Sequence, residues 1–436
     1  MSMNRRHFMS HMAASAAMTA PVAASFTNLL QANAKDMQKR QKACIMLFMN
    51  AGPPTIDIWD LKPGQPTGGP FQEIETSAPG VKISEHMPLM AKQMHHTAIV
   101  RSMSTREADH NRGRYYMHTG YVPNPSIEHP SYGAVIAKEL GNPNLEIPPF
   151  VAIGGASYGP GFLGMSYAPF VVDSNGDVRN LNMNMEAPRL AQRLGMLAEI
   201  EGGFAASARG EAPIEHKKVI DRTVTLMTSD QMKAFKIDDE PANVKERYGI
   251  AAPGAGMAAG GQGGMRRNTT FGRSCLVARR LVERGVPFVE VDMGGWDLHQ
   301  TTHDTLKNNL LPTLDQGMSA LIEDLAQRGM LEDTAVVWMG DFGRTPRINA
   351  RAGRDHWARC WSTVVAGGGL KGGQAVGATN EDGTAVADSC DPIKSEDLMA
   401  SVLKGLGVSL ETTYTSKNNR PMKIANSGKV IKELFA

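Results

Sequence analysis

Cysteine is scarce in this chain of 436 residues, which has four cysteines, at positions 44, 275, 360 and 390, and no C-x-x-C pair. This spacing excludes a zinc ribbon, an iron–sulfur site and a disulfide framework. Excess charge is also missing, because 46 basic residues face 44 acidic ones. The basic residues are dispersed, so we expect no nucleic-acid partner. The chain also lacks an uninterrupted apolar run long enough to span a bilayer, so we expect no integral membrane segment.

The composition that is present is that of a large globular protein. Hydrophobic residues make up 42% and charged residues 21% of the chain, which allows a sizeable core and argues against bulk disorder. The 45 glycines and 25 prolines indicate many loops. A length of 436 residues is ordinary for one large α/β enzyme.

The first 34 residues have the layout of an export signal. Arg5 and Arg6 precede an Ala-rich stretch at 13–30, and an A-x-A pattern follows at 32–34. The arginine pair resembles a twin-arginine signal, which predicts a periplasmic or secreted protein. The alternative is a chance arginine pair on an amphipathic helix. Because this segment holds two basic residues and no acidic ones, the remaining chain has 44 of each sign and is formally neutral.

Strand-like and helix-like segments alternate along the rest of the chain. This order predicts one α/β domain over 43–436 with a largely parallel sheet. Residues 150–180 and the Gly/Ala-rich segment 251–264 are expected to be loops, the latter flexible. Apolar runs predict strands at 44–49, 97–100, 286–292, 335–339 and 362–366, and periodic patterns predict helices at 110–119, 131–140, 213–236, 270–284, 304–328 and 395–406.

Asp297 and His299 follow the expected strand 286–292, at the strand end where open α/β sheets place their sites. Two residues apart in an extended segment, their side chains point the same way and suit a divalent metal. His303 would share a face with His299 if a helix began early. Alternatively, Asp297 caps the next helix and His299 is a surface residue.

Two further segments carry candidate ligands. Asp341 stands at the end of the expected strand 335–339, where it is either a metal ligand or the partner of Arg344. His356 is a second candidate ligand, and Asp355 beside it is either a ligand or the group that orients it.

The expected helix 110–119 begins with His110 and carries Arg112 and Arg114. Helix N-termini favour anions, and arginine binds phosphate or sulfate bidentately. The alternative is that both arginines are solvated or form ordinary ion pairs.

Four segments, read in order, have a distinctive pattern: 56–63 (IDIWDLKP), 295–299 (GWDLH), 341–346 (DFGRTP) and 353–357 (GRDHW). Together they resemble the twin-arginine-exported bacterial proteins grouped as domain of unknown function 1501, and more broadly the alkaline-phosphatase/sulfatase superfamily. The resemblance covers the chain from Cys44 to about Gly377. It implies a three-layer α/β/α sandwich and a divalent metal, whether zinc, calcium or magnesium.

The resemblance also implies roles for individual residues. Asp297, His299, Asp341 and His356 would be metal ligands, while Phe342 stands where sulfatases keep a histidine. An ungapped count places His110 at the sulfatase nucleophile and Arg114 at the motif arginine. His110 could then be a nucleophile, a ligand or a general acid. The first strand normally supplies aspartate ligands, and here Asp57 or Asp60 could substitute for them.

Three hypotheses follow. The first is an exported metal-dependent hydrolase of phosphate or sulfate esters, acting on a small molecule or glycan. The second is a non-catalytic binding or assembly protein on the same fold, suggested by Phe342 and by the missing Cys or Ser nucleophile; it predicts that the candidate residues do not converge. The third is an unrelated α/β fold in which these residues serve turns and caps.

Overall fold

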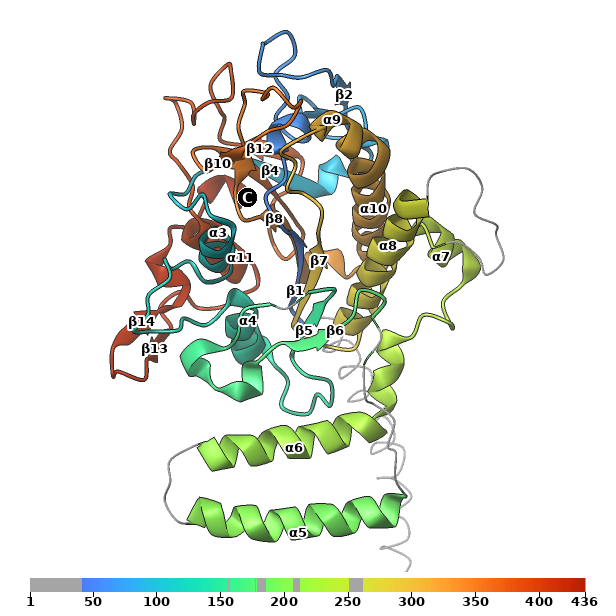
Figure 1. Ribbon diagram of the computed structural model, residues 1–436, viewed down its shortest axis with the longest axis vertical. Coiled ribbons are helices and arrows are strands. Elements are labelled where there is room, and N and C mark those ends of the chain that lie inside the picture. The colour runs from blue at the N-terminus through green and yellow to red at the C-terminus, as the bar shows by residue number, and fades with distance from the viewer. Residues whose placement is uncertain are drawn as a thin grey trace, which may run out of the picture. The chain divides into compact units, whose positions relative to one another are not determined.

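An eight-stranded sheet forms the centre of the protein (Figure 1). The computed structural model describes residues 41–155, 157–176, 178, 186–206, 212–250 and 262–435, and residues from Lys42 onward belong to one compact unit. The predicted export signal lies outside the described residues. The strand order is β12 (Gln374–Val376), β4 (Thr97–Met103), β11 (Trp361–Ala366), β8 (Thr334–Gly340), β1 (Ala43–Met49), β7 (Phe288–Met293), β5 (Phe150–Ile153) and β6 (Phe170–Val172).

Seven of these strands run in one direction, and β11 alone is antiparallel to both of its neighbours. The expected largely parallel sheet is confirmed. In register, Met49 of β1 pairs with Met293 of β7 and with Gly340 of β8. The three central strands therefore end level, and their carboxyl ends open at one edge.

Helices cover both faces of the sheet, which gives the expected three layers. Ile45 and Leu47 of β1 join the core beneath α8 (Gln262–Glu283) and α10 (Leu311–Gln327). Met46 and Phe48 point the other way, toward α4 (Tyr132–Leu140) and α11 (Ser395–Gly405). Figure 1 shows these helices on opposite sides of the sheet. All seven residues of β1 are buried, as expected for a central parallel strand.

The structure corrects some expectations about local structure and confirms others. Residues 150–180 are not only loops, since β5 pairs in register with β7 and with β6. The expected helix 304–328 is confirmed as one continuous helical segment made of α9 (Thr302–Thr305), a π-helical turn (Leu306–Leu310) and α10, since Thr305, Leu310 and Leu311 keep right-handed helical backbone angles. Of the expected loop 251–264, residues 251–261 lie outside the described part, and 262–264 already belong to α8.

Helix α5 (Ala187–Ala206) was not expected, and α6 (Ala212–Thr228) ends earlier than the expected 236. Within the described residues, no helix is both long and apolar enough to cross a membrane. The remaining elements are α2 (Pro88–Ala91), α3 (His110–Thr119), α7 (Ala242–Arg247), β2 (Glu73–Glu75), β3 (Lys82–Ser84), β9 (Gly343–Arg344), β10 (His356–Trp357), β13 (Thr413–Thr415), β14 (Pro421–Lys423) and short 3-10 turns at Thr55–Asp57, Met94–His96, Gly161–Leu163, Met165–Tyr167, Asp230–Phe235, Leu331–Asp333, Ile424–Ser427 and Lys432–Leu434.

Candidate functional site

Histidine and aspartate side chains from four segments meet beyond the carboxyl ends of β7 and β8. Asp341 follows β8 directly, and Asp297 and His299 lie on the loop after β7. His356 belongs to β10, whose pairing with β9 returns it toward the same edge. His110 is the first residue of α3, where Asp109 caps the helix by accepting a hydrogen bond from the Arg112 backbone N–H.

Asp297 is the centre of this cluster. Its Oδ1 lies 3.2 Å from Nε2 of His110, 3.0 Å from Nε2 of His299 and 3.6 Å from Nε2 of His356. The side chain of Asp297 is 49% exposed, so the cluster is open to solvent. Asp297 does not cap the next helix, because α9 begins only at Thr302.

In each of the three imidazole rings, Nδ1 forms a hydrogen bond on the side of the ring that faces away from Asp297. The acceptors are Asp341 Oδ2 for His110 at 2.6 Å, Asp355 Oδ1 for His299 at 2.8 Å and the Ala108 carbonyl oxygen for His356 at 2.8 Å. A carbonyl or carboxylate oxygen only accepts, so this network assigns a proton to each Nδ1. In the neutral tautomers, the Nε2 lone pairs of all three rings then face the cluster.

The facing lone pairs favour a cation. Nε2 of His299 and Nε2 of His356 are 3.1 Å apart, a contact that needs a proton or a positive charge between the two nitrogens. Ligand atoms of His110, Asp297 and His356 all lie within 4.8 Å of one another. Imidazole nitrogens and a carboxylate oxygen are ligands that zinc and related metals accept. The residues present therefore fit a divalent metal.

Arg344 supplies the positive charge already present in the cluster. Its Nη2 donates to Asp297 Oδ1 at 2.6 Å, and its Nη1 lies 3.3 Å from Nε2 of His299. The same guanidinium donates to the carbonyl oxygens of Ala51 and Gly52, which fixes it against the turn after β1. Partial burial would raise the pKa of Asp297, but the hydrogen bond and charge of Arg344 lower it to about 2.

Asp341 acts on the cluster through His110. Its side chain is fully buried, and its Oδ1 has no hydrogen-bond partner among the described residues. The hydrogen bond to Asp341 raises the pKa of His110, against the opposing effect of partial burial. Phe342 stacks on the His110 ring with the centroids 5.0 Å apart. The predicted ligand Asp341 therefore stands behind His110, and His110 itself points into the cluster.

A buried ion pair anchors the loop that carries Asp355 and His356. Arg354 donates from Nε and Nη2 to the two carboxylate oxygens of Asp57, each at 2.7 Å, and both side chains are fully buried. Nε2 of His303 lies 3.1 Å from Asp57 Oδ1. The Asp57 carboxylate is thus the structural partner of Arg354 and does not reach the cluster. The expectation that His303 would lie beside His299 is wrong, because His303 contacts Asp57.

Arg114 faces a second polar cluster one helical turn from His110. Its Nη2 donates to Asp292 Oδ2 at 2.9 Å. One turn further along α3, Nε2 of the buried His118 lies 3.0 Å from Glu290 Oε1. Burial raises the pKa of Asp292 to about 6, although Arg114 opposes this shift. Glu290 and Asp292 are alternate residues of β7, and charged residues at this spacing in an apolar strand were the signal that the sequence analysis missed.

Two other predicted groups lie elsewhere. Arg112 forms an ordinary ion pair with Glu107, at 2.5 Å. Asp60 hydrogen-bonds to Lys62 at 3.1 Å and accepts a hydrogen bond from Thr379. Neither contributes to the cluster around Asp297.

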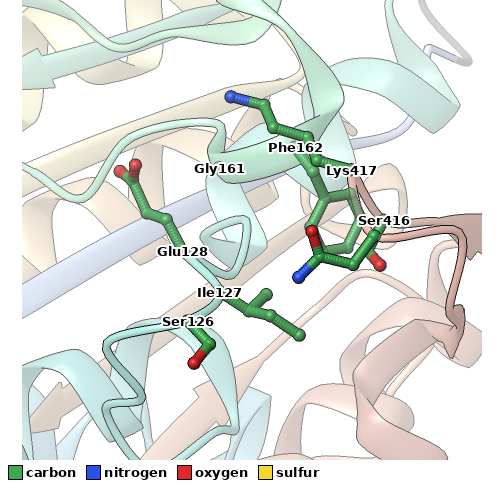
Figure 2. A pocket seen from close by; sticks show the side chains of 8 residues that line it. Ser126, Ile127, Glu128, Gly161, Phe162, Ser416 and Lys417 are labelled. Atoms are coloured by element: carbon green, nitrogen blue, oxygen red, sulfur yellow. The ribbon is translucent and has the colours of Figure 1, made fainter.

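A separate pocket of about 90 Å³ opens between three loops (Figure 2). It shares no residue with the cluster around Asp297, and neither histidine nor cysteine lines it. It therefore offers no imidazole ligands of the kind found in that cluster. Its lining residues are Ser126, Ile127, Glu128, Gly161, Phe162, Ser416, Lys417 and Asn418.

A family model described as "Protein of unknown function (DUF1501)" matches residues 41–435. No curated protein matches the sequence. Among solved structures, the chain is similar to the PsFucS1 sulfatase from Pseudoalteromonas sp., with 12% identity and a TM-score of 0.39 over 86% of this chain and 70% of that one. The chain is also similar to the phosphonate monoester hydrolase SpPMH from Silicibacter pomeroyi, with 11% identity and a TM-score of 0.42 over 91% of this chain and 77% of that one. A third similar structure is an alkaline phosphatase from the Antarctic bacterium TAB5, with 11% identity and a TM-score of 0.32 over 84% of this chain and 98% of that one.

The Asp57–Arg354 pair yields a stability prediction. Replacing Arg354 by methionine leaves the Asp57 carboxylate buried without its partner, and we expect the free energy of unfolding to fall by about 3–5 kcal/mol. Urea denaturation measures this. The control, Lys217→Met, removes an exposed ion pair with Asp221 and should have little effect. Equal stability of Arg354→Met and wild type would contradict the role assigned to the pair.

Asp292 yields a pH prediction. Its pKa in the folded protein, about 6, lies above the usual 3.8, so the folded state holds this proton more tightly than the unfolded state. Its stabilising contribution is therefore fully present below pH 3.8 and is lost as the pH rises through about 6. Wild type should lose stability relative to Asp292→Asn over this range, as measured by urea denaturation at stepped pH. The exposed substitution Asp221→Asn is the control, and parallel curves for wild type and Asp292→Asn would refute the assignment.

Proposed function

This chain belongs to the DUF1501 family, and we propose that it is a metal-dependent hydrolase of phosphate or sulfate esters. The observation that carries the proposal is the convergence of three imidazole Nε2 atoms on Asp297 Oδ1, with every ring tied back at Nδ1. A merely structural cluster of turn and cap residues gives no reason for three tied-back rings to face one carboxylate.

The proposed metal ligands are His110, Asp297 and His356, with His299 in reach of the same position. Three imidazoles favour zinc over magnesium or calcium, which prefer oxygen ligands. When bound, a divalent metal polarises an ester oxygen and stabilises the charge that develops on it.

The chain's own residues would perform the remaining tasks. Arg344 holds Asp297 ionised and oriented, and Asp341 orients the His110 ring by accepting a hydrogen bond from its Nδ1. Because the side chains of Arg344 and Asp341 are buried, they keep Asp297 and His110 in place without reorganisation during the reaction. Since the hydrogen-bond partners found for Asp297 and Asp341 include no serine, threonine or cysteine, we assign the attack on the ester to water.

We propose Arg114 as the group that binds the anionic part of the ester. It projects from the same face of α3 as His110, one turn away. Its partner Asp292 competes for the guanidinium, but the raised pKa of Asp292 weakens that competition in mildly acidic solution.

Export is a further part of the proposal. The support for it is the sequence of residues 1–34, with Arg5 and Arg6 before an apolar stretch and an A-x-A pattern. We propose that the protein reaches the periplasm or the exterior through the twin-arginine route.

The second candidate function, a non-catalytic binding protein, is favoured by one specific observation. Arg344 already donates to Asp297 Oδ1 and lies close to Nε2 of His299, so a guanidinium occupies part of the space that a metal would use. In that case the cluster is held together by Arg344 and requires no metal.

Metal analysis separates the two functions. After equilibration with zinc, magnesium or calcium and removal of the excess, we expect wild type to retain roughly one zinc ion per chain. His356→Ala should lose both the zinc and the hydrolysis of aryl phosphate and sulfate esters, because one ligand is gone. His95→Ala replaces an exposed histidine outside the cluster and should behave as wild type. A wild-type protein that retains no metal and cleaves no ester would leave only the binding function.

A substitution of Asp355 tests whether its hydrogen bond to Nδ1 of His299 supports metal binding. Asp355→Asn leaves Nε2 of His299 in place but replaces the carboxylate that orients the ring at Nδ1. We expect zinc affinity to fall by about 10–100-fold, measured by competition with a chromophoric chelator. Asp304→Asn, a nearby exposed carboxylate, is the matched control. An unchanged affinity in Asp355→Asn would mean that His299 takes no part in binding.

A further inference from the structure

Helix α5 leaves almost all of its surface uncovered. None of the side chains described for α5 is buried. It lies beside α6 (Figure 1), and Leu194 and Leu197 line the groove between the two helices together with Ile220 and Val224 of α6. One apolar side of α5 is thereby used within the protomer.

A second apolar stripe on α5 faces solvent. Met196 is 60% exposed and Ile200 is 69% exposed, and both are among the most exposed large hydrophobic residues described. At 3.6 residues per turn, Met196 lies about 130° around the helix from the midpoint of Leu194 and Leu197. The stripe therefore cannot pack against α6 at the same time as the leucines do.

Glycines make α5 dependent on packing. Gly195, Gly202 and Gly203 lie within the helix, and glycine lowers intrinsic helix stability relative to alanine. A Cβ built at any of the three meets no atom within 4 Å, so the protomer leaves open space beside them. Gly203 falls on the same face as Met196, where a small residue permits close approach of another helix.

The charges beside the stripe are arranged for a symmetric partner. Arg193 and Glu199 stand three residues before and three residues after Met196, and both are exposed. Neither has an opposite charge three or four residues away, where an ion pair within the helix would form. If two copies of α5 pack antiparallel about a twofold axis at Met196, Arg193 of each copy faces Glu199 of the other.

We propose that this face of α5 binds a second copy of the chain and forms a twofold-symmetric dimer. Met196 lies at the axis, Ile200 packs beside it, and two Arg193–Glu199 pairs flank the contact. The two copies of α5, each with its α6, then form a four-helix arrangement. A lipid surface fits less well, because helices that lie on membranes carry a predominantly basic polar face, and this stripe is flanked by both signs. The dimer is independent of the proposed hydrolase activity.

Sedimentation equilibrium of the full chain at micromolar concentration tests the proposal. We expect wild type to be a dimer and Met196→Lys to be a monomer at the same concentration. Met165→Lys is the matched control, because Met165 is 59% exposed but lies outside α5, and it should remain a dimer. Zinc content and ester hydrolysis should be the same in Met196→Lys and wild type, which separates this test from that of the hydrolase.

A charge swap tests the register. Arg193→Glu and Glu199→Arg should each weaken the dimer at least tenfold, because each places like charges opposite one another twice. The double variant should recover the dimer, since it restores opposite charges across the axis. A monomeric wild type, a dimeric Met196→Lys, a double variant that stays monomeric, or a monomer that binds anionic phosphatidylglycerol vesicles through α5 would each overturn the proposal.

Discussion

The hydrogen bonds at the Nδ1 atoms of His110, His299 and His356 are the constraint on which the site depends. Each bond places a proton on the outer nitrogen and turns the Nε2 lone pair toward Asp297. Three lone pairs and a carboxylate in one place repel one another unless positive charge lies among them. Arg344 supplies such a charge from one side, and a divalent metal would supply the rest. The tautomers, more than the residue types alone, make this an arrangement that fits a divalent metal.

The fold maintains this arrangement with buried side chains that support the cluster. Arg344 donates a hydrogen bond to the Gly52 carbonyl oxygen in the turn after β1. The position of the cluster is therefore fixed relative to the central strand of the sheet. Arg354 and Asp57 fix the neighbouring loop with paired hydrogen bonds in a dry environment, where such charges hold a geometry firmly. β1, β7 and β8 end level, so the loops that follow them start from one rigid edge. The side chains of the cluster, although distant in sequence, are thus held at fixed distances from one another.

Much of the framework could be predicted because it depends on local pattern. The apolar runs of β1, β7 and β8 identified the central strands, and the rule that sites lie at their carboxyl ends located Asp297 and Asp341. The partners could not be predicted, because they depend on the tertiary path of loops. Asp341 supports His110 from behind, and Arg344 contacts Asp297 across the loop. Strand β5 was missed for a similar reason, since four residues become a strand only through pairing with β7.

The central claim is that the imidazoles and Asp297 bind a divalent metal, and X-ray absorption spectroscopy of the zinc-loaded protein tests it most directly. Zinc bound by the imidazoles and Asp297 should have a coordination shell of imidazole nitrogens and carboxylate oxygen at about 2.0–2.2 Å, with the outer-shell scattering typical of imidazole rings. A shell made only of oxygen atoms, or one without imidazole scattering, would contradict it, because zinc would then be bound elsewhere and the Asp297 cluster would be closed by Arg344 alone.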